Sequence, residues 1–279
     1  MKYDLKNKIC LITGGCGGIG FETARVLSQA GAVTVLVCRD RARGEAARSA
    51  LAGAGGGSVE TLACDLASQA QIRALAAEFK SRYGALHVLV NNAAVVPARR
   101  TLTEDGIEMQ FAVNHLAYFL LTGLLLDNIK ASAPARIVNV SSGLHRRAHL
   151  DFGSLQAEKG YKGMAHYSRT KLLNILFTTE LARRLEGTGV TANTLSPGFT
   201  ATGLGRSFGP FSRFVMKRFA MTVDRGADTV AYLAASPEVE GVTGAYFNKR
   251  KSEPTSPESR DAASAARLWA LSEALTHSR

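Results

Sequence analysis

Short apolar segments alternate with longer helical patterns along most of the chain. The short segments are rich in β-branched residues and nearly continuous in apolar character, which is typical of strands covered on both faces. These strands are expected at residues 9–13, 33–38, 59–64, 87–92, 136–142, 190–196 and 244–248. Helices are expected between them, at 18–30, 41–52, 68–82, 105–128 and 164–186. Repeated strand–helix–strand units predict an α/β fold, with a doubly wound parallel sheet and helices on both faces.

The 279 residues are expected to form one domain, residues 1–279. The glycine-rich stretch 52–58 is a short loop between a helix and a strand, and no linker divides the chain. We assign a core to about 7–250 and a C-terminal helical tail to about 251–279. In this tail Ser256 can cap a helix that has Pro257 at its first position. The apolar stripe that would dock the tail onto the core consists of Leu268, Leu271 and Leu275.

Hydropathy and charge argue against a membrane-spanning or nucleic-acid-binding protein. The longest near-apolar run, 111–126, is shorter than a membrane span and contains Asn114 and His115, so a buried helix is expected. The first residues lack an apolar stretch long enough for a signal peptide, and we expect a cytoplasmic protein. The net charge of +11 is spread along the chain without a nucleic-acid motif. It suits an anionic cofactor or a membrane surface.

The four cysteines are Cys10, Cys16, Cys38 and Cys64. No two of them have CxxC spacing, and no His/Cys cluster has the spacing of zinc ligands. We therefore expect reduced, buried thiols and no metal site.

A glycine-rich turn, TGGCGGIG at 13–20, joins the first expected strand to the first expected helix. The helix N-terminus offers free backbone N–H groups and the positive end of a dipole to an anion. Glycine lets the backbone approach a pyrophosphate closely and permits positive φ. The turn therefore predicts phosphate binding, and the alternative is a tight turn without a ligand.

The ordered motifs resemble the short-chain dehydrogenase/reductase superfamily over roughly residues 7–250. The matching motifs are TGxxxGxG at 13–20, NNAA at 91–94, VSS at 140–142, Tyr-x-x-x-Lys at 167–171 and SPGFTAT at 196–202. Ala94 stands where the family has glycine. The resemblance implies a single Rossmann-type domain and an oxidoreductase that uses a nicotinamide cofactor.

The resemblance also implies catalytic roles for Asn114, Ser142, Tyr167 and Lys171. Tyr167 would be the general acid/base, and Lys171 lies at i+4 on the same helix face, where its ammonium would lower the tyrosine pKa. Ser142, rather than its neighbour Ser141, would polarise the substrate oxygen. Asn114 would hold a water in a proton relay to Lys171, or it is a satisfied core asparagine. We expect His145, His149 and His166 to be loop or surface residues.

The end of the second expected strand predicts the cofactor preference. Cys38 occupies the usual position of an acidic ribose ligand, and Arg39 follows it. An arginine there accommodates a 2′-phosphate, so we predict NADP(H). Alternatively Asp40 binds the ribose, and Arg39 is only a surface charge. Unlike many relatives that prefer NADP, this chain has no basic residue inside the glycine turn.

Other cofactor contacts follow from the resemblance. Asp65 would lie by the adenine, Asn91 and Ala93 by the ribose, and the segment after the sixth expected strand by the nicotinamide. The complete predicted set is Thr13, Gly14, Gly18, Ile19, Gly20, Arg39, Asp65, Leu66, Asn91, Ala93, Tyr167, Lys171, Pro197, Gly198, Thr200 and Thr202.

A long segment between Ser142 and Tyr167 resembles the retinol dehydrogenase-like branch of the superfamily. The stretch 206–221 interleaves basic and apolar residues and suits a mobile lid over a lipophilic substrate. The lid residues would be Phe208, Phe211, Phe214 and Phe219. The same stretch suits a short interfacial helix in peripheral contact with a membrane, or an ordinary packed helix.

Taken together, these features predict an NADP(H)-dependent reductase of lipophilic ketones or aldehydes, or the reverse alcohol dehydrogenase. The alternatives are a C=C reductase on the same scaffold and a non-catalytic NADPH-binding regulatory protein. The expected helices 105–128 and 164–186 could form a homodimer, although the long loop and the tail could obstruct it.

Overall fold

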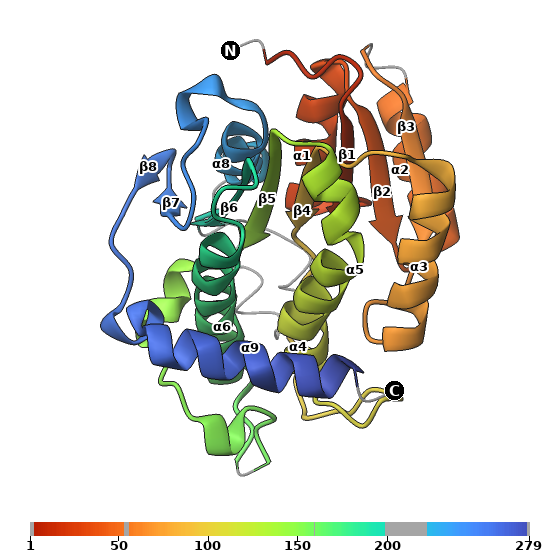
Figure 1. Cartoon of the computed structure of the whole chain (residues 1–279). Helices are drawn as coiled ribbons and strands as arrows, with labels where there is room; N and C mark the ends of the chain where they lie inside the picture. The colour runs from red at the N-terminus through yellow and green to blue at the C-terminus, as the bar shows by residue number, and fades with distance from the viewer. Residues whose placement is uncertain (1–2, 53–55, 159, 199–221, 278–279) are drawn as a thin grey trace.

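The computed structural model describes residues 3–52, 56–158, 160–198 and 222–277. In this part of the chain one eight-stranded sheet has the order β3-β2-β1-β4-β5-β6-β7-β8. The strands are β1 (Ile9–Thr13), β2 (Val33–Cys38), β3 (Val59–Ala63), β4 (Val88–Asn91), β5 (Ala135–Val140), β6 (Val190–Ser196), β7 (Tyr246–Asn248) and β8 (Lys251–Ser252). All neighbours pair in parallel except β7 and β8. The predicted α/β fold with a doubly wound sheet is confirmed (Figure 1).

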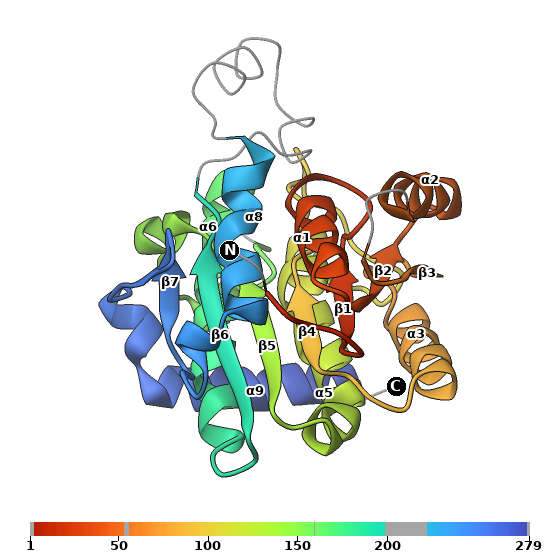
Figure 2. The ribbon, with the colours of Figure 1, turned by 90° about the horizontal axis from the view of Figure 1, so that it is seen from above.

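Helices cover both faces of this sheet. They are α1 (Gly18–Gln29), α2 (Arg41–Ala52), α3 (Gln69–Arg82), α4 (Met109–Phe111), α5 (Ala117–Ala131), α6 (Gly163–Arg184), α8 (Val223–Ala235) and α9 (Ala262–His277). Shorter helical turns are η1 (Ala112–Leu116), η2 (Gly143–Arg147), η3 (Phe152–Ser154), η5 (Pro237–Val239) and η6 (Pro257–Arg260). The helices α1 and α8 lie side by side on one face (Figure 2), and α3, α5 and α6 cover the other.

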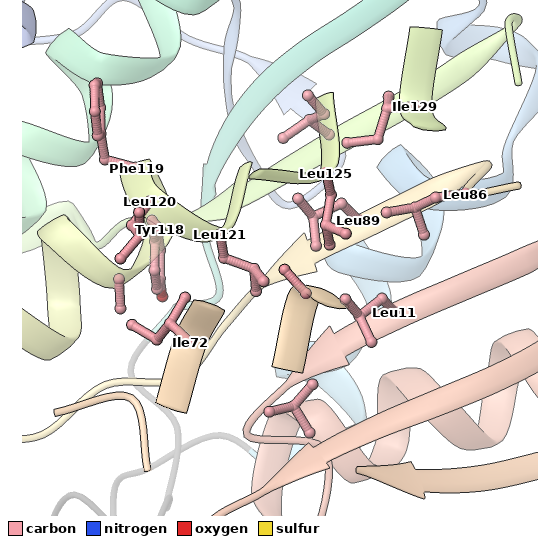
Figure 3. Close-up of a cluster of buried hydrophobic side chains, with 14 of the residues drawn as sticks. Leu11, Ile72, Leu86, Leu89, Tyr118, Phe119, Leu120, Leu121, Leu125 and Ile129 are labelled. Carbon is pink, nitrogen blue, oxygen red and sulfur yellow. The ribbon is translucent and has the colours of Figure 1, made fainter. Parts of the chain in front are cut away.

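The alternation of side chains along each strand divides the core into two layers. On β1, Leu11 points toward α3, α5 and α6, whereas Cys10 and Ile12 point toward α1, α2 and α8. The first layer contains Tyr118 and neighbouring leucines of α5, packed on the sheet (Figure 3). Each strand therefore presents apolar side chains to both faces, which explains its nearly continuous apolar sequence.

The apolar run at 111–126 is confirmed as a buried helix. Among the described residues, Met109–Ala131 is one helix long and apolar enough to cross a membrane by length and composition, yet 78% of its most apolar stretch is buried in the protein. The short α4 is followed by the π-helical turn η1 before α5 begins, so the helical run differs from the regular helix expected at 105–128.

The C-terminal tail docks as predicted but begins differently. Residues 257–260 form the 3₁₀ turn η6, and the Ser256 side chain makes no capping hydrogen bond there. The α-helix starts at Ala262, where an Asp261 carboxylate oxygen accepts a hydrogen bond from the Ser264 N–H (2.8 Å). Leu268 is buried beside α6. Figure 1 shows α9 running across α6 toward α4.

Candidate active site

The strand order places the turn after β1 beside the end of β4, where the direction of winding reverses. Ligands of doubly wound sheets bind in the crevice at such a point. The Thr13 hydroxyl accepts hydrogen bonds from the N–H groups of Asn92 (2.8 Å) and Ala93 (3.1 Å). The Asn92 side-chain amide donates to the Thr13 carbonyl (2.8 Å). These bonds fix the turn against the segment after β4, so Thr13 has a structural role in shaping the crevice.

Two glycines of the turn, Gly14 and Gly20, approach each other so closely that no larger residue fits at position 20. Gly14 has a φ of +67°, and a Cβ on Gly20 would lie 2.4 Å from the Gly14 carbonyl oxygen. At the start of α1, the N-cap Gly17 has no side chain to bond the free N–H groups, and the first turn has no acidic residue. The amino end of α1 therefore offers unopposed N–H donors, which fits a pyrophosphate group.

The basic residues after β2 lie beside this turn. Arg39 is exposed, and Asp40 caps α2 by accepting a hydrogen bond from the Arg43 N–H (2.9 Å). The Arg43 side chain reaches back, so that its Nη2 lies 3.4 Å from where a Cβ on Gly17 would stand. The turn itself has no basic residue, and Arg43 supplies a guanidinium at this place from the neighbouring helix. The sequence places Arg43 after the second expected strand, but it does not show that the side chain reaches the glycine turn.

The predicted adenine and ribose contacts vary in exposure. An Asp65 carboxylate oxygen accepts a hydrogen bond from the Ala67 N–H (3.0 Å), and Leu66 is buried. The Asn91 side chain is buried in the core, where its amide donates to Thr122 (3.0 Å) and Asn139 (2.8 Å).

Tyr167 and Lys171 lie one turn apart on the buried face of α6. Their exposed fractions are 8% and 1%. The Lys171 ammonium nitrogen donates to the Val140 carbonyl oxygen (2.9 Å) and lies 5.5 Å from the centre of the Tyr167 ring. The end of β5 thus holds the lysine next to the tyrosine, as the spacing predicts.

The two serines after β5 have different partners. The Ser141 hydroxyl donates to the Lys171 carbonyl oxygen (2.6 Å) and is buried. Ser142 makes a side-chain hydrogen bond with Tyr167, and its oxygen also accepts from the Leu144 N–H (3.2 Å). Ser141 therefore ties α6 to β5, while the Ser142 hydroxyl lies with the tyrosine hydroxyl.

The electrostatics of the pair differ from the sequence-based expectation. Burial raises the pKa of Tyr167 to about 12, against a smaller lowering by the Ser142 hydrogen bond. Burial also lowers the pKa of Lys171 to about 7. The expected lowering of the tyrosine pKa by Lys171 is therefore not found, and burial is the largest effect on both groups.

Asn114 lies in the π-helical turn η1, close to α6. Its side-chain oxygen accepts from the Val95 N–H (2.8 Å), and its amide donates to the Val95 carbonyl (3.0 Å) and the Thr170 hydroxyl (3.2 Å). These bonds fit the reading as a satisfied core asparagine, and the water relay stays a prediction. Tyr118, four residues on, donates to the Ala93 carbonyl (2.9 Å), and its ring centre lies 5.5 Å from the Lys171 Nζ. We did not single out this tyrosine in the sequence, although its spacing from Asn114 places both on one helix face.

The three nearby histidines, expected in loops or on the surface, differ in burial: His145 lies in the segment between β5 and α6 but is buried, and His166 is buried on α6. His145 is linked through Nδ1 to the Ser142 carbonyl (2.7 Å), and burial lowers its pKa. His166 pairs through Nε2 with the buried Glu108 carboxylate (2.7 Å). His149 is exposed and contacts Glu258 (2.8 Å). His166 thus ties the start of α6 to Glu108, and the His145 ring lies against the Tyr246 ring of β7, with ring centres 4.9 Å apart.

The segment after β6 joins the same end of the sheet. The Ser196 hydroxyl accepts hydrogen bonds from the N–H groups of Gly143 (3.0 Å) and Gly198 (3.2 Å). Pro197 and Gly198 therefore lie close to the turn that carries Ser142. The predicted contacts Thr200 and Thr202 lie outside the described residues, as does the lid, Phe208, Phe211, Phe214 and Phe219.

A cavity of about 900 Å³ lies at the opposite, amino-terminal end of the strands. Among its lining residues are Lys8, His87 and Arg136, far along the strands from the glycine turn. It takes no part in the candidate active site. The described residues contain no group of three or more His, Cys, Asp or Glu that could hold a metal ion.

The family model of short chain dehydrogenases matches residues 8–211. Mouse retinol dehydrogenase 14 is 46% identical over 97% of this chain and 86% of its own length. A crystal structure of an uncharacterized protein from Mycobacterium paratuberculosis superposes with a TM-score of 0.80 at 31% identity, covering 99% of this chain and 96% of that one. A Burkholderia cenocepacia short chain dehydrogenase in complex with NADP gives a TM-score of 0.71 at 26% identity, covering 87% and 96%.

With its winding reversal, glycine turn and Ser–Tyr–Lys cluster, the chain belongs to the short-chain dehydrogenase family. Within that family it lies in the retinol dehydrogenase-like branch. It is therefore an oxidoreductase that uses a nicotinamide cofactor to interconvert alcohols and carbonyls.

Proposed function

We propose that this protein is an NADP(H)-dependent oxidoreductase that reduces a lipophilic ketone or aldehyde, or oxidises the corresponding alcohol. The observation that carries the proposal is the hydrogen bond between the Ser142 and Tyr167 hydroxyl groups, one helical turn from the Lys171 ammonium. A neutral phenol beside a second hydroxyl is what carbonyl reduction requires, because the substrate oxygen needs both polarisation and a proton.

Each side chain has a distinct task in this proposal. The bound nicotinamide would supply or accept a hydride at the substrate carbon. Tyr167 would donate a proton to the carbonyl oxygen, and Ser142 would donate a hydrogen bond to the same oxygen. Lys171, held by the Val140 carbonyl, would position the tyrosine and hold a proton near it. Asn114 would hold a water that leads to Lys171.

The preference for NADP(H) is supported by the arginines after β2. Asp40 is already engaged in capping α2, while Arg39 is exposed and Arg43 leans over the glycine turn. Guanidinium groups at this place can pair with a 2′-phosphate. The remaining predicted contacts, from Thr13 to Thr202, would hold the rest of the cofactor.

Cofactor titration tests this preference directly. Arg39→Ala should weaken NADPH binding by about 10- to 150-fold, the equivalent of roughly 1.5–3 kcal/mol for a lost charge-assisted hydrogen bond. NADH binding should hardly change. Arg48→Ala, an exposed arginine of α2 paired with Glu45, is the matched control. Equal affinities of the unmutated protein for NADPH and NADH would reject the proposal.

A lipophilic substrate is supported by the names of the relatives and by the apolar residues of 206–221. A lid formed by Phe208, Phe211, Phe214 and Phe219 would cover the substrate. We further propose a cytoplasmic protein that touches a membrane peripherally through the same segment. A homodimer through α5 and α6 stays a prediction, and α9 already packs on part of α6.

The deciding experiment is turnover on a panel of aldehydes, ketones, secondary alcohols and activated alkenes, including retinaldehyde, followed at the cofactor absorbance. Tyr167→Phe should reduce carbonyl turnover by roughly 100-fold or more while NADPH still binds. Ser142→Ala should cost about 100- to 1,000-fold, as for loss of a donor to a developing oxyanion.

Ser141→Ala is the matched control, because this hydroxyl bonds the α6 backbone and not the tyrosine. Near-normal carbonyl turnover in Tyr167→Phe would refute the assigned acid. Turnover of alkenes alone would favour the C=C reductase, and NADPH binding without any turnover would favour a regulatory protein.

A further inference from the structure

Two cysteines far apart in sequence meet at the glycine turn. Cys16 lies in the turn after β1, and Cys38 is the last residue of β2. The N–H groups of Gly14 and Gly15 donate to the Val37 carbonyl oxygen (3.0 and 3.4 Å), so the turn runs along the end of β2. This pairing brings the two thiols into hydrogen-bonding contact, and both are free.

The two thiols differ in access to solvent. Cys38 is 2% exposed and packs under Gly44, where a Cβ would lie 3.3 Å from the Cys38 Cβ. Cys16 is half-buried. A peroxide or an alkylating reagent can therefore reach Cys16 from solvent, whereas Cys38 is shielded from solvent.

The other cysteines cannot take the place of either partner. Cys64 belongs to the core layer on the opposite face of the sheet from Cys38. Cys10 is fully buried and pairs in register with Thr34, four residues before Cys38 on β2. The Cys16–Cys38 contact is therefore a specific pair within the described residues.

The groups around the two thiols shift the pKa values of Cys16 and Cys38 in opposite directions. The Cys38 thiol donates a hydrogen bond to Cys16, which lowers the pKa of Cys16 against the opposing effect of its partial burial, and the nearby Arg43 charge lowers it further. Asp40 acts weakly in the opposite direction. The same contact and burial raise the pKa of Cys38. Cys16, the more exposed of the two, is therefore the better placed to form the reactive thiolate, and burial favours the protonated form of Cys38.

We propose that Cys16 and Cys38 form a peroxide-sensitive dithiol site, in which Cys16 is the nucleophile and Cys38 the resolving thiol. The Cys16 sulfur attacks one peroxide oxygen, the O–O bond breaks, and a sulfenic acid and one water form. The Cys38 sulfur then attacks the sulfenic sulfur, the S–O bond breaks, and a disulfide and a second water form. Two thiols are oxidised by two electrons, and one peroxide is reduced to two waters.

The site adjoins the place where the nucleotide would bind, so its state should affect binding. A disulfide removes the thiolate beside Arg43 and ties the glycine turn covalently to β2. It would therefore change the turn whose free N–H groups face the pyrophosphate. This consequence rests on the proposed function, whereas the dithiol chemistry does not.

Peptide mass analysis after treatment with hydrogen peroxide tests the chemistry. Trypsin releases Cys16 in peptide 9–25, which also holds Cys10, and Cys38 in peptide 26–39. The experiment therefore uses the full chain with Cys10→Ser and Cys64→Ser. We expect the two peptides to be joined by a disulfide, two hydrogen masses lighter than their sum, and to be released by dithiothreitol.

Single variants then separate the two roles. Adding Cys38→Ser should leave a sulfenic acid on Cys16 that dimedone traps, and adding Cys16→Ser should leave Cys38 unmodified. Thermal unfolding of each variant shows that it is folded. Peptides that stay separate in the parent, or sulfenic acid on Cys38, would overturn the proposal.

NADPH affinity of the reduced and the oxidised protein is measured on the same samples. We expect oxidation to weaken binding at least tenfold. Equal affinity of both forms would overturn the coupling to the nucleotide site. Failure of the reduced protein to bind NADPH would count against the proposed function instead, while the peptide masses would still decide the dithiol chemistry.

Discussion

Replacing Lys171 with methionine should stabilise the ligand-free protein while abolishing its activity. Lys171 is 1% exposed, and burial lowers its pKa from 10.5 to about 7. That difference, at about 1.4 kcal/mol for each pH unit, corresponds to roughly 5 kcal/mol as an upper bound on the cost of burying the charge. Methionine fills a similar volume but loses the hydrogen bond to the Val140 carbonyl, which offsets about 1–3 kcal/mol. We expect a net gain of about 2 kcal/mol at pH 7.

The dependence on pH identifies the cause. Unfolded chains keep the Lys171 proton up to a pH of about 10.5, whereas the folded protein releases it near 7. Between these two pH values the unfolded state binds more protons than the folded state. The free energy of unfolding of the unmutated protein therefore increases steadily from pH 7 toward pH 10. The methionine variant lacks this contribution. Its advantage should therefore shrink by roughly 2–3 kcal/mol between pH 7 and pH 9.

Urea denaturation followed by circular dichroism at pH 6, 7, 8 and 9 measures the free energies of unfolding. Lys80→Met, at an exposed lysine of α3, is the matched control and should show no such trend. A Lys171→Met variant less stable at pH 7 than the unmutated protein would refute the reasoning. A difference between the two that does not change with pH would refute it as well.

Three further outcomes follow from residues described above. Gly20→Ala places a methyl group 2.4 Å from the Gly14 carbonyl oxygen, so NADPH affinity measured by fluorescence should fall at least tenfold; unchanged affinity would show that the turn can move apart. Leu268→Ala removes an α9 side chain that is buried against α6 and should lower the free energy of unfolding in urea by about 2–5 kcal/mol, with a smaller loss indicating that α9 contributes little. If the lid prediction holds, Phe211→Ala should lower kcat/KM for a bulky apolar carbonyl and spare a small one, by roughly 1–3 kcal/mol for a lost buried aromatic contact; parallel losses would favour an ordinary packed helix.

The sheet could be predicted from the sequence because its strands carry a strong local signal. β1, β2 and β6 have the expected bounds. The first two are continuously apolar or β-branched, and all three end at a polar or glycine-containing segment. The helix α8 and the two-residue strand β8 were not predicted. The helix α8 does carry an amphipathic pattern, with Ala227, Val230 and Ala231 on its buried side, so its sequence could have predicted it. The strand β8 depends on pairing with β7.

The candidate catalytic residues could be grouped from motif spacing, but their contacts could not. The family motif selects Ser142 over Ser141, but only the fold shows the different contacts of the two serines. Ser141 bonds the backbone of α6, and Ser142 bonds Tyr167. The high tyrosine pKa depends on burial, which spacing does not report. Likewise, the approach of Arg43 to the turn depends on how α2 packs beside β2.

The docking of α9 has a consequence for the order in which the chain folds. The Ser272 hydroxyl of α9 bonds His115, 157 residues earlier, and α9 carbonyl groups accept hydrogen bonds from Gln69 (3.0 Å) and Arg73, more than 200 residues earlier. Contacts of such long sequence separation form slowly, because a long loop must close first. During synthesis, α5 and α6 are complete well before α9 exists. Their apolar side chains beneath the future α9 must therefore stay exposed for several seconds at ordinary rates of translation, about 5–20 residues per second. In this interval the nascent chain is most open to aggregation and to chaperone binding.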